Sequence, residues 1–251
     1  MRSADFATID PTLNEDVPLT TVSALSGEGT VLVLAPHPDD ESLGCGALLM
    51  QIFVRSPRLA HVICLTDGAA SHPGSKAVPG ERLATIRRQE TETALTCLGG
   101  SAANLTFIGA PDGALVATPE IIAKVVSVAR ACEARLLLAP SPLDPHCDHV
   151  AGAQIGRMST AQLSDVQLGF YPVWSRWHGA GRAPVPDGTR AVQLPTGDCA
   201  ARKSRAIAAH ASQQGLIVPD APDGFEMPPG FADFFASSNE IYFLVEPEGA
   251  T

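Results

Sequence analysis

Four short runs of apolar residues recur along the first 140 residues, and segments with helical periodicity separate them. The runs cover residues 30–36, 61–66, 104–108 and 135–140. They are mostly continuous rather than alternating, which is typical of strands that are covered on both faces. Strands that alternate with helices in this way predict a parallel sheet with right-handed crossovers. The sequence therefore predicts an α/β fold, a three-layer Rossmann-like sandwich with a mostly parallel sheet.

Helical periodicity marks the segments between these runs. The predicted helices cover residues 41–54, 81–98, 119–133 and 149–158. The second ends at Gly99-Gly100, a sequence typical of a helix C-cap, and the third begins at Pro119, which favours a first helical turn. Beyond residue 160 we expect strands at 166–171 and 241–245, a helix at 198–212, and long Gly- and Pro-rich loops at 179–197 and 215–229.

Composition favours a single folded domain. Of the 251 residues, 45% are apolar and 18% are charged, which allows a large core and excludes a disordered chain. Residues 1–28 carry no clear pattern and are expected to form an irregular N-terminal extension. We expect one domain over residues 29–251.

The charge and the cysteines narrow the classes of partner and compartment. A net charge of −10 argues against binding to nucleic acid or anionic lipid, because like charges repel. We find no signal-peptide pattern and no apolar stretch long enough to span a membrane. The six cysteines are scattered without a Cys-x-x-Cys pair, so a cytoplasmic location is expected. No pattern predicts an oligomeric state.

Polar residues follow all four predicted strands at their carboxyl ends. His37-Pro38-Asp39-Asp40-Glu41 follows the first strand, and Asp144-Pro145-His146-Cys147-Asp148-His149 follows the fourth. Asp67-Gly68 and Asp112-Gly113 follow the second and third. Ligands of open α/β sheets bind in the crevice beyond these strand ends. Two His/Asp clusters more than 100 residues apart in sequence are therefore expected to face one crevice.

The two clusters together predict a metal site. His37 and Asp40 are three residues apart where a helix begins, so both side chains can face one side. With His149 they supply two imidazoles and one carboxylate, which leaves positions for water and suits a hydrolytic Zn²⁺. The same ligand set also suits Fe²⁺.

Each motif alone also has a structural interpretation. Asp39 or Asp40 could cap the helix that follows, and Glu41 could be favoured by the helix dipole. The Asp-Gly pairs could be ordinary turns. Two His/Asp clusters, each after a predicted core strand, favour the metal site.

These motifs resemble those of the LmbE/PIG-L-type N-deacetylases, and the resemblance extends over about residues 30–245. The matching segments are Ala35-Pro36-His37-Pro38-Asp39-Asp40-Glu41, Thr66-Asp67-Gly68, Arg87-x-x-Glu90, Pro111-Asp112-Gly113, His146-Cys147-Asp148-His149 and Lys203…His210-x-Ser212-Gln213. Enzymes of this family are Zn-dependent, have a Rossmann-like fold and remove acyl groups, usually acetyl, from the 2-amino group of glucosamine-type sugars.

The resemblance implies a role for each residue of the two clusters. It implies His37, Asp40 and His149 as metal ligands and Asp39 as the general base. These roles fit amide hydrolysis, which needs an activated water, a polarised carbonyl and a protonated leaving amine.

The resemblance also implies roles around the metal site. His146 is expected to face the developing oxyanion as an imidazolium, with Asp148 orienting it, and Arg87 and Asp112 are expected to touch the sugar. One departure is Cys147, where the family commonly has proline. Its thiol could bind the metal or be oxidised, but we expect it to be passive and to point away from the metal.

The sequence thus predicts a metal-dependent hydrolase that acts on an N-acetylated amino sugar or glycoconjugate. One alternative is a catalytically inactive sugar-binding protein of the same fold. Another is a metal hydrolase acting on a different amide or on a phosphoester, for which Glu41, Asp67 and Asp144 would have to build a second metal site. The acceptor sugar and the acyl chain length are left open.

Aromatic residues after position 170 have two possible roles. Trp174 and Trp177 could stack on a sugar ring, although an anchor at the edge of the core is the more common role of tryptophan. Four phenylalanines could line a lid or anchor a long loop: Phe225, Phe231, Phe234 and Phe235.

Overall fold

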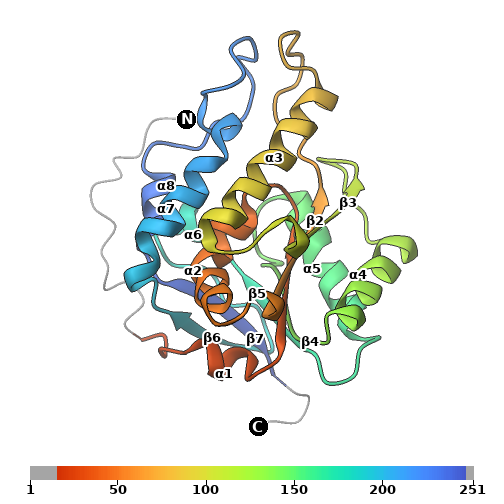
Figure 1. Cartoon of the computed structure of the whole chain (residues 1–251), viewed down its shortest axis with the longest axis vertical. Coiled ribbons are helices and arrows are strands. Elements are labelled where there is room, and N and C mark those ends of the chain that lie inside the picture. The colour runs from red at the N-terminus through yellow and green to blue at the C-terminus, as the bar shows by residue number, and fades with distance from the viewer. Residues whose placement is uncertain (1–15, 247–251) are drawn as a thin grey trace.

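The computed structural model describes residues 16–246, in which helices cover both faces of a central sheet (Figure 1). The elements in chain order are α1 (Val22–Ser26), β1 (Thr30–Ala35), α2 (Asp40–Arg55), β2 (Ala60–Thr66), α3 (Gly80–Leu98), β3 (Leu105–Ala110), α4 (Pro119–Ala131), β4 (Ala134–Pro140), α5 (Cys147–Thr160), β5 (Gln167–Tyr171), α6 (Trp174–His178), β6 (Thr189–Leu194), α7 (Ala200–Ala209), α8 (Phe231–Ser237) and β7 (Glu240–Val245). Within these residues no helix is both long and apolar enough to cross a bilayer.

The sheet has seven strands in the order β3-β2-β1-β4-β5-β7-β6. The first five are parallel, and β7 pairs antiparallel with both β5 and β6. From β1 the chain adds β2 and β3 on one side, and it then returns to add β4 and β5 on the other. This reversal places a topological switch point between β1 and β4, where a crevice opens at the carboxyl ends of the strands.

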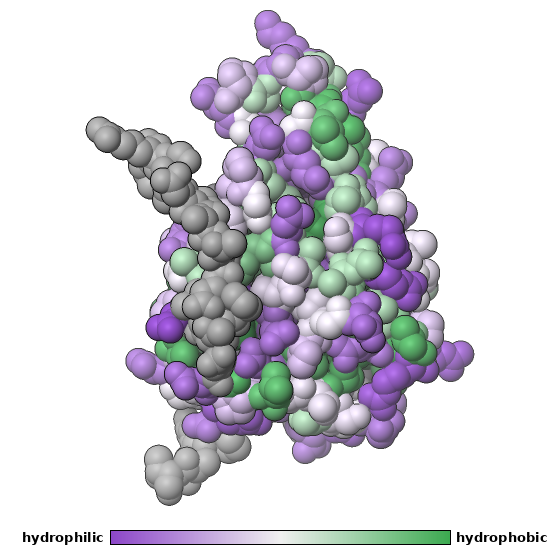
Figure 2. All heavy atoms as spheres, turned by 90° about the vertical axis from the view of Figure 1, so that its left-hand side faces the viewer, coloured by the Kyte–Doolittle hydropathy of each residue, from purple (hydrophilic) through white to green (hydrophobic). Residues whose placement is uncertain are grey.

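Successive residues of β1 from Val31 onward point into two different cores, and they are fully buried. Val31 and Val33 pack beneath α2, α3, α7 and α8, whereas Leu32 and Leu34 pack beneath α4 and α5. This two-sided burial is the physical reason for the continuous apolar runs, and it confirms the predicted three-layer α/β sandwich. Figure 2 shows the side of the molecule on which α7 and α8 lie, where polar and apolar residues are mixed on the surface.

Two segments differ from the sequence prediction. The predicted loop 179–197 contains the strand β6, whose Val192 and Leu194 are buried against β7. Its flanking glycines and prolines obscured a strand of only six residues. The predicted irregular extension 1–28 ends in the helix α1, which buries Val22 and Leu25 in the core. Residues 1–15 of that extension lie outside the described residues.

A buried ion pair joins α7 to β7. Lys203 Nζ lies 2.7 Å from Glu240 Oε1, and both side chains are inaccessible to solvent. Glu240 also accepts hydrogen bonds from the backbone N–H groups of Ala47 and Leu48 and from the hydroxyl of Tyr242. The Glu240 carboxylate therefore connects the helices α2 and α7 to the strand β7.

Removing one partner of this pair is expected to destabilise the fold. Lys203→Met leaves the Glu240 carboxylate buried without its cation, which costs about 3–5 kcal/mol. Urea denaturation should show this loss, whereas Lys124→Met, at an exposed lysine of α4, should change the unfolding free energy by less than about 0.5 kcal/mol. The double variant Lys203→Met/Glu240→Gln should recover part of the loss, and no recovery would contradict the electrostatic explanation.

Candidate metal centre

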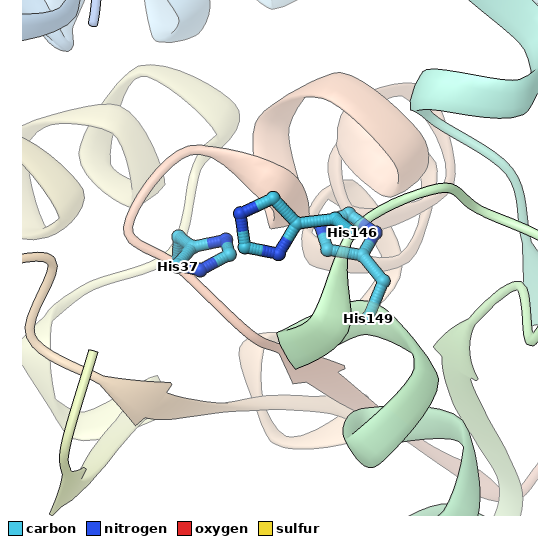
Figure 3. A group of neighbouring side chains, drawn as sticks. All are labelled: His37, His146 and His149. Atoms are coloured by element: carbon cyan, nitrogen blue, oxygen red, sulfur yellow. The ribbon is translucent and has the colours of Figure 1, made fainter. Parts of the chain in front are cut away.

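Three imidazole rings meet at the switch point between β1 and β4. His37 lies in the loop after β1, and His146 and His149 lie at the start of α5 (Figure 3). The ring centroid of His37 is 4.7 Å from that of His146 and 5.6 Å from that of His149. Each ring offers one nitrogen, and these three nitrogens lie within 4.8 Å of one another. The two predicted His/Asp clusters are therefore brought together.

Asp40 joins two of these histidines. Its Oδ2 lies 3.3 Å from His37 Nδ1, and its Oδ1 lies 3.3 Å from His149 Nε2. Burial raises the pKa of this carboxyl, but the two histidines outweigh burial and hold it well below its usual range. Burial likewise lowers the pKa of both histidines, yet their carboxylate partners raise it to about 9 in His37 and about 10 in His149. The carboxylates around these two rings therefore make the site attractive to a cation, whether a proton or a metal ion.

Asp144 fixes the orientation of His149. Its Oδ2 lies 2.9 Å from His149 Nδ1, and its carboxylate also accepts from the backbone N–H groups of Val173 and Ser175. A ring that donates from Nδ1 presents Nε2 as an acceptor. The sequence analysis considered Asp144 only as a ligand of a second metal, because its spacing from His149 gives no signal of this contact.

A bound metal ion fits the orphaned atom of this ring. His149 Nε2 is buried and makes no hydrogen bond within residues 16–246, although Asp40 Oδ1 is near. A buried acceptor without a donor is rare in proteins, and a carboxylate behind the opposite ring nitrogen is typical of histidines that bind metals. His37, Asp40 and His149 therefore form a group that could hold Zn²⁺ or Fe²⁺.

Asp39 has a backbone conformation that is unfavourable for a residue with a side chain. Its φ is 147°, and its backbone N–H donates to Glu41 Oε2. The buried guanidinium of Arg87 lies 3.2 Å from Asp39 Oδ2 and also donates to the backbone oxygens of Pro38 and Gly68. Burial raises the pKa of Asp39 to about 6, against the opposing effect of Arg87. A carboxylate with this pKa is suited to accept and return a proton near neutral pH.

Two contacts that the sequence analysis missed support this loop from behind. Glu41 Oε1 lies 3.2 Å from His210 Nε2 and accepts from the Ser42 hydroxyl. Glu90 accepts from both the backbone N–H and the hydroxyl of Ser212, at 2.7 Å each. Glu41 is therefore more than a favourable charge at a helix start. The His210-x-Ser212 segment was recognised only as a motif, and the structure shows that it packs on α2 and α3.

Asp148 differs from its predicted contact. Its carboxylate accepts from the backbone N–H groups of Gly113 and Leu115 and lies 3.1 Å from His37 Nε2, so it orients His37 rather than the side chain of His146. Instead, His146 Nδ1 accepts the backbone N–H of Asp148. Burial and the neighbouring histidines lower the pKa of His146, which favours a neutral ring over the expected imidazolium.

The remaining predicted residues line the same crevice. Asp112 accepts from the backbone N–H of Ala70 and lies 3.4 Å from His37 Nε2. Arg87 makes its hydrogen bonds with protein groups, so its contact with a sugar stays a prediction. Cys147 is exposed, and its Sγ lies 3.6 Å from Asp148 Oδ1, so it stands beside the site rather than pointing away from it.

A cavity of about 200 Å³ is lined at its base by His37, Asp40 and His146 of the candidate metal centre. Its rim includes Ser71 from the loop 67–79 and Gln213, Phe225 and Met227 from the segment 210–230. These two loops form the upper end of the molecule in Figure 1, and the backbone N–H of Phe225 donates to Ser71 O. Trp174 and Phe231, which were candidates for stacking or anchoring, also line the cavity.

Comparison with a family model places this site in a known context. Residues 32–159, which contain both His/Asp clusters, match the model of PIG-L, described as GlcNAc-PI de-N-acetylase.

Solved structures share the fold at low identity. The N,N'-diacetylchitobiose deacetylase from Pyrococcus horikoshii is 19% identical, with a TM-score of 0.67 over 93% of this chain and 90% of that one. A zinc-inhibited teicoplanin deacetylase is 17% identical, with a TM-score of 0.65 over 88% of this chain and 100% of that one. The 4-carboxy-2-hydroxymuconate hydratase from Pseudomonas putida KT2440 is 16% identical, with a TM-score of 0.68 over 89% and 98%. At these identities the likeness concerns the fold alone, which carries more than one chemistry.

Asp144→Asn is expected to weaken metal binding. The amide keeps the shape of the side chain but no longer favours the His149 tautomer that presents Nε2, and loss of such a contact typically costs about 10–100-fold in metal affinity. Titration of metal-free protein with Zn²⁺ measures the change. Asp165→Asn, at an exposed aspartate, is the matched control. Equal affinities of the two variants would contradict the role of Asp144.

Proposed function

The chain belongs to the PIG-L (GlcNAc-PI de-N-acetylase) family, and from this premise we propose that it is a metal-dependent hydrolase that removes an N-acyl group, such as acetyl, from a glucosamine-type sugar or glycoconjugate. The observation that carries the proposal is the buried His149 Nε2, which makes no hydrogen bond among residues 16–246 and lies 3.3 Å from Asp40 Oδ1. A metal held by His37, Asp40 and His149 would supply a Lewis acid for the amide carbonyl and lower the pKa of a water molecule.

The protein's own groups would manage the protons. Asp39, held by Arg87, would accept a proton from the attacking water and deliver it to the leaving amine. His146 faces the same space from the start of α5 and would stabilise negative charge that develops on the carbonyl oxygen. A neutral ring can do so by donating from Nε2, because its Nδ1 accepts the backbone N–H of Asp148.

The alternatives are less compatible with the site. A second metal site would need Glu41 and Asp144 as ligands. The Glu41 carboxylate already contacts His210, and the Asp144 carboxylate contacts His149 and accepts from the backbone N–H of Val173. A sugar-binding protein without activity would not need Asp39 in a strained conformation beside the metal group. Because a hydratase shares this fold, the bond that is broken has to be measured directly.

We place the protein in the cytoplasm in this proposal. All six cysteines are free, and Cys45, Cys64 and Cys199 are buried. Unpaired cysteines are typical of a reducing compartment. The charge of −10 supports a small amino-sugar derivative as partner over nucleic acid.

The metal requirement is tested by elemental analysis together with acetate release from N-acetylglucosamine derivatives. Wild-type protein should hold about one Zn²⁺ or Fe²⁺ per chain, as expected for three protein ligands. His149→Ala should lose both the metal and acetate release. His61→Ala, at a half-buried histidine on β2 that contacts Thr106, should keep both. A metal-free wild type that cannot be reconstituted would refute the proposal.

The role of Asp39 is tested by Asp39→Asn. The amide cannot accept a proton, so kcat should fall by about 10²–10⁴-fold while the metal content stays at the wild-type level. Steady-state kinetics and elemental analysis on the same preparation separate the two effects. Retention of more than a tenth of wild-type kcat would exclude Asp39 as the general base.

A further inference from the structure

The cavity above the metal centre is lined by two kinds of side chain. Polar groups come from the loops after β2 and β3, among them Ser71 and Asp112. Five large apolar side chains, here called the apolar wall, also line it: Leu43, Trp174, Phe225, Met227 and Phe231. The strand order places β2 and β3 on one side of the β1–β4 switch point and β5, which leads into Trp174, on the other.

The apolar wall is firmly packed. The ring centroid of Trp174 lies 5.2 Å from that of Phe231 and 5.7 Å from that of Phe225. Leu43, Met227 and Phe231 are buried, whereas Trp174 and Phe225 are half-buried, so part of each of these two rings faces the cavity. A preformed apolar surface of this kind needs little reorganisation to receive an apolar group.

An amide of an amino sugar has the same two-sided chemistry. Its nitrogen carries the polar sugar, and its carbonyl carbon carries the apolar alkyl part of the acyl group. With the amide at the switch point, the sugar matches the polar groups after β2 and β3, and the alkyl part of the acyl group matches the apolar wall on the side of Trp174. An acetyl group offers only one methyl to these five side chains. We propose, resting on the proposed amide hydrolysis, that the substrate carries a linear acyl chain longer than acetyl, bound against the apolar wall.

A series of N-acylglucosamines tests this directly. We compare kcat/KM for the N-acetyl, N-butanoyl, N-hexanoyl and N-octanoyl compounds. Each methylene that the wall removes from water contributes up to about 0.8 kcal/mol, which corresponds to about fourfold in kcat/KM. We expect a rise along the series of at least about tenfold in total. A value for N-acetylglucosamine equal to or above that of the longer compounds would overturn the proposal.

The same apolar length at the other end of the substrate distinguishes the acyl chain from the aglycone. The octyl β-glycoside of N-acetylglucosamine places eight carbons on the sugar rather than on the carbonyl carbon. We expect its kcat/KM to stay within about threefold of that of the methyl glycoside. A gain as large as that of the octanoyl amide would overturn the assignment of the wall to the acyl chain.

Variants of the wall should change the preference between substrates. Trp174→Ala should lower the ratio of kcat/KM for the octanoyl and acetyl compounds about tenfold, and Phe225→Ala provides a second variant should the first fail to fold. Phe107→Ala removes a half-buried ring on β3, outside the cavity, and should leave the ratio unchanged. Because the ratio compares two substrates on one preparation, loss of folded protein cancels. An unchanged ratio in both wall variants would overturn the proposal.

Binding of the free acids separates this inference from the proposed function. Octanoate should bind more tightly than acetate and change the fluorescence of Trp174, and Trp174→Ala should lose that change. Tighter octanoate binding without hydrolysis of any amide would refute the proposed function but support the wall as a site for acyl chains. Hydrolysis without preference for length, together with equal binding of the two acids, would refute only the wall.

Discussion

The structure depends on the burial of several ionisable groups at one point of the sheet. Asp40 sits between two histidines, and Asp144 and Asp148 hold those histidines from behind. Burying a single charge is costly, so such a cluster is stable only where each charge has partners of opposite sign or backbone donors. The parallel sheet makes this possible because β1 and β4 are neighbours, which brings segments more than 100 residues apart to one crevice.

Support for the cluster comes from a wider set of contacts than its own residues. Glu41, Glu90 and Arg87 connect the loop after β1 to α3 and to the segment after α7. These groups are buried and hydrogen-bonded, so they fix backbone positions rather than touch solvent. A small displacement of the loop would separate Asp39 from the groups beside it. These surrounding contacts therefore determine how accurately the carboxylate of Asp39, the proposed base, is placed.

The sequence was sufficient to predict the layers and the convergence of the two His/Asp clusters, but not the contacts around them. Continuous apolar strands can be recognised because both faces are buried, and strand ends converge by topology alone. Hence the sequence alone indicates that His37, Asp40 and His149 lie together. The orienting role of Asp144 and the contact of Asp148 with His37 depend on local loop geometry, which spacing does not encode. The strand β6 was missed because a short strand at the edge of the sheet needs few apolar residues.

The backbone of Asp39 has a consequence for how this chain balances folding against chemistry. A glycine adopts a φ of 147° more readily than a residue with a side chain, and only the ion pair with the buried Arg87 gives folding a reason for an aspartate there. Such a conformation costs of the order of 1–3 kcal/mol, and the surrounding contacts have to offset it. Stability and catalysis therefore make opposite demands on this position. A search for more thermostable variants of this protein would be drawn to residue 39, and each gain found there would remove the proposed base.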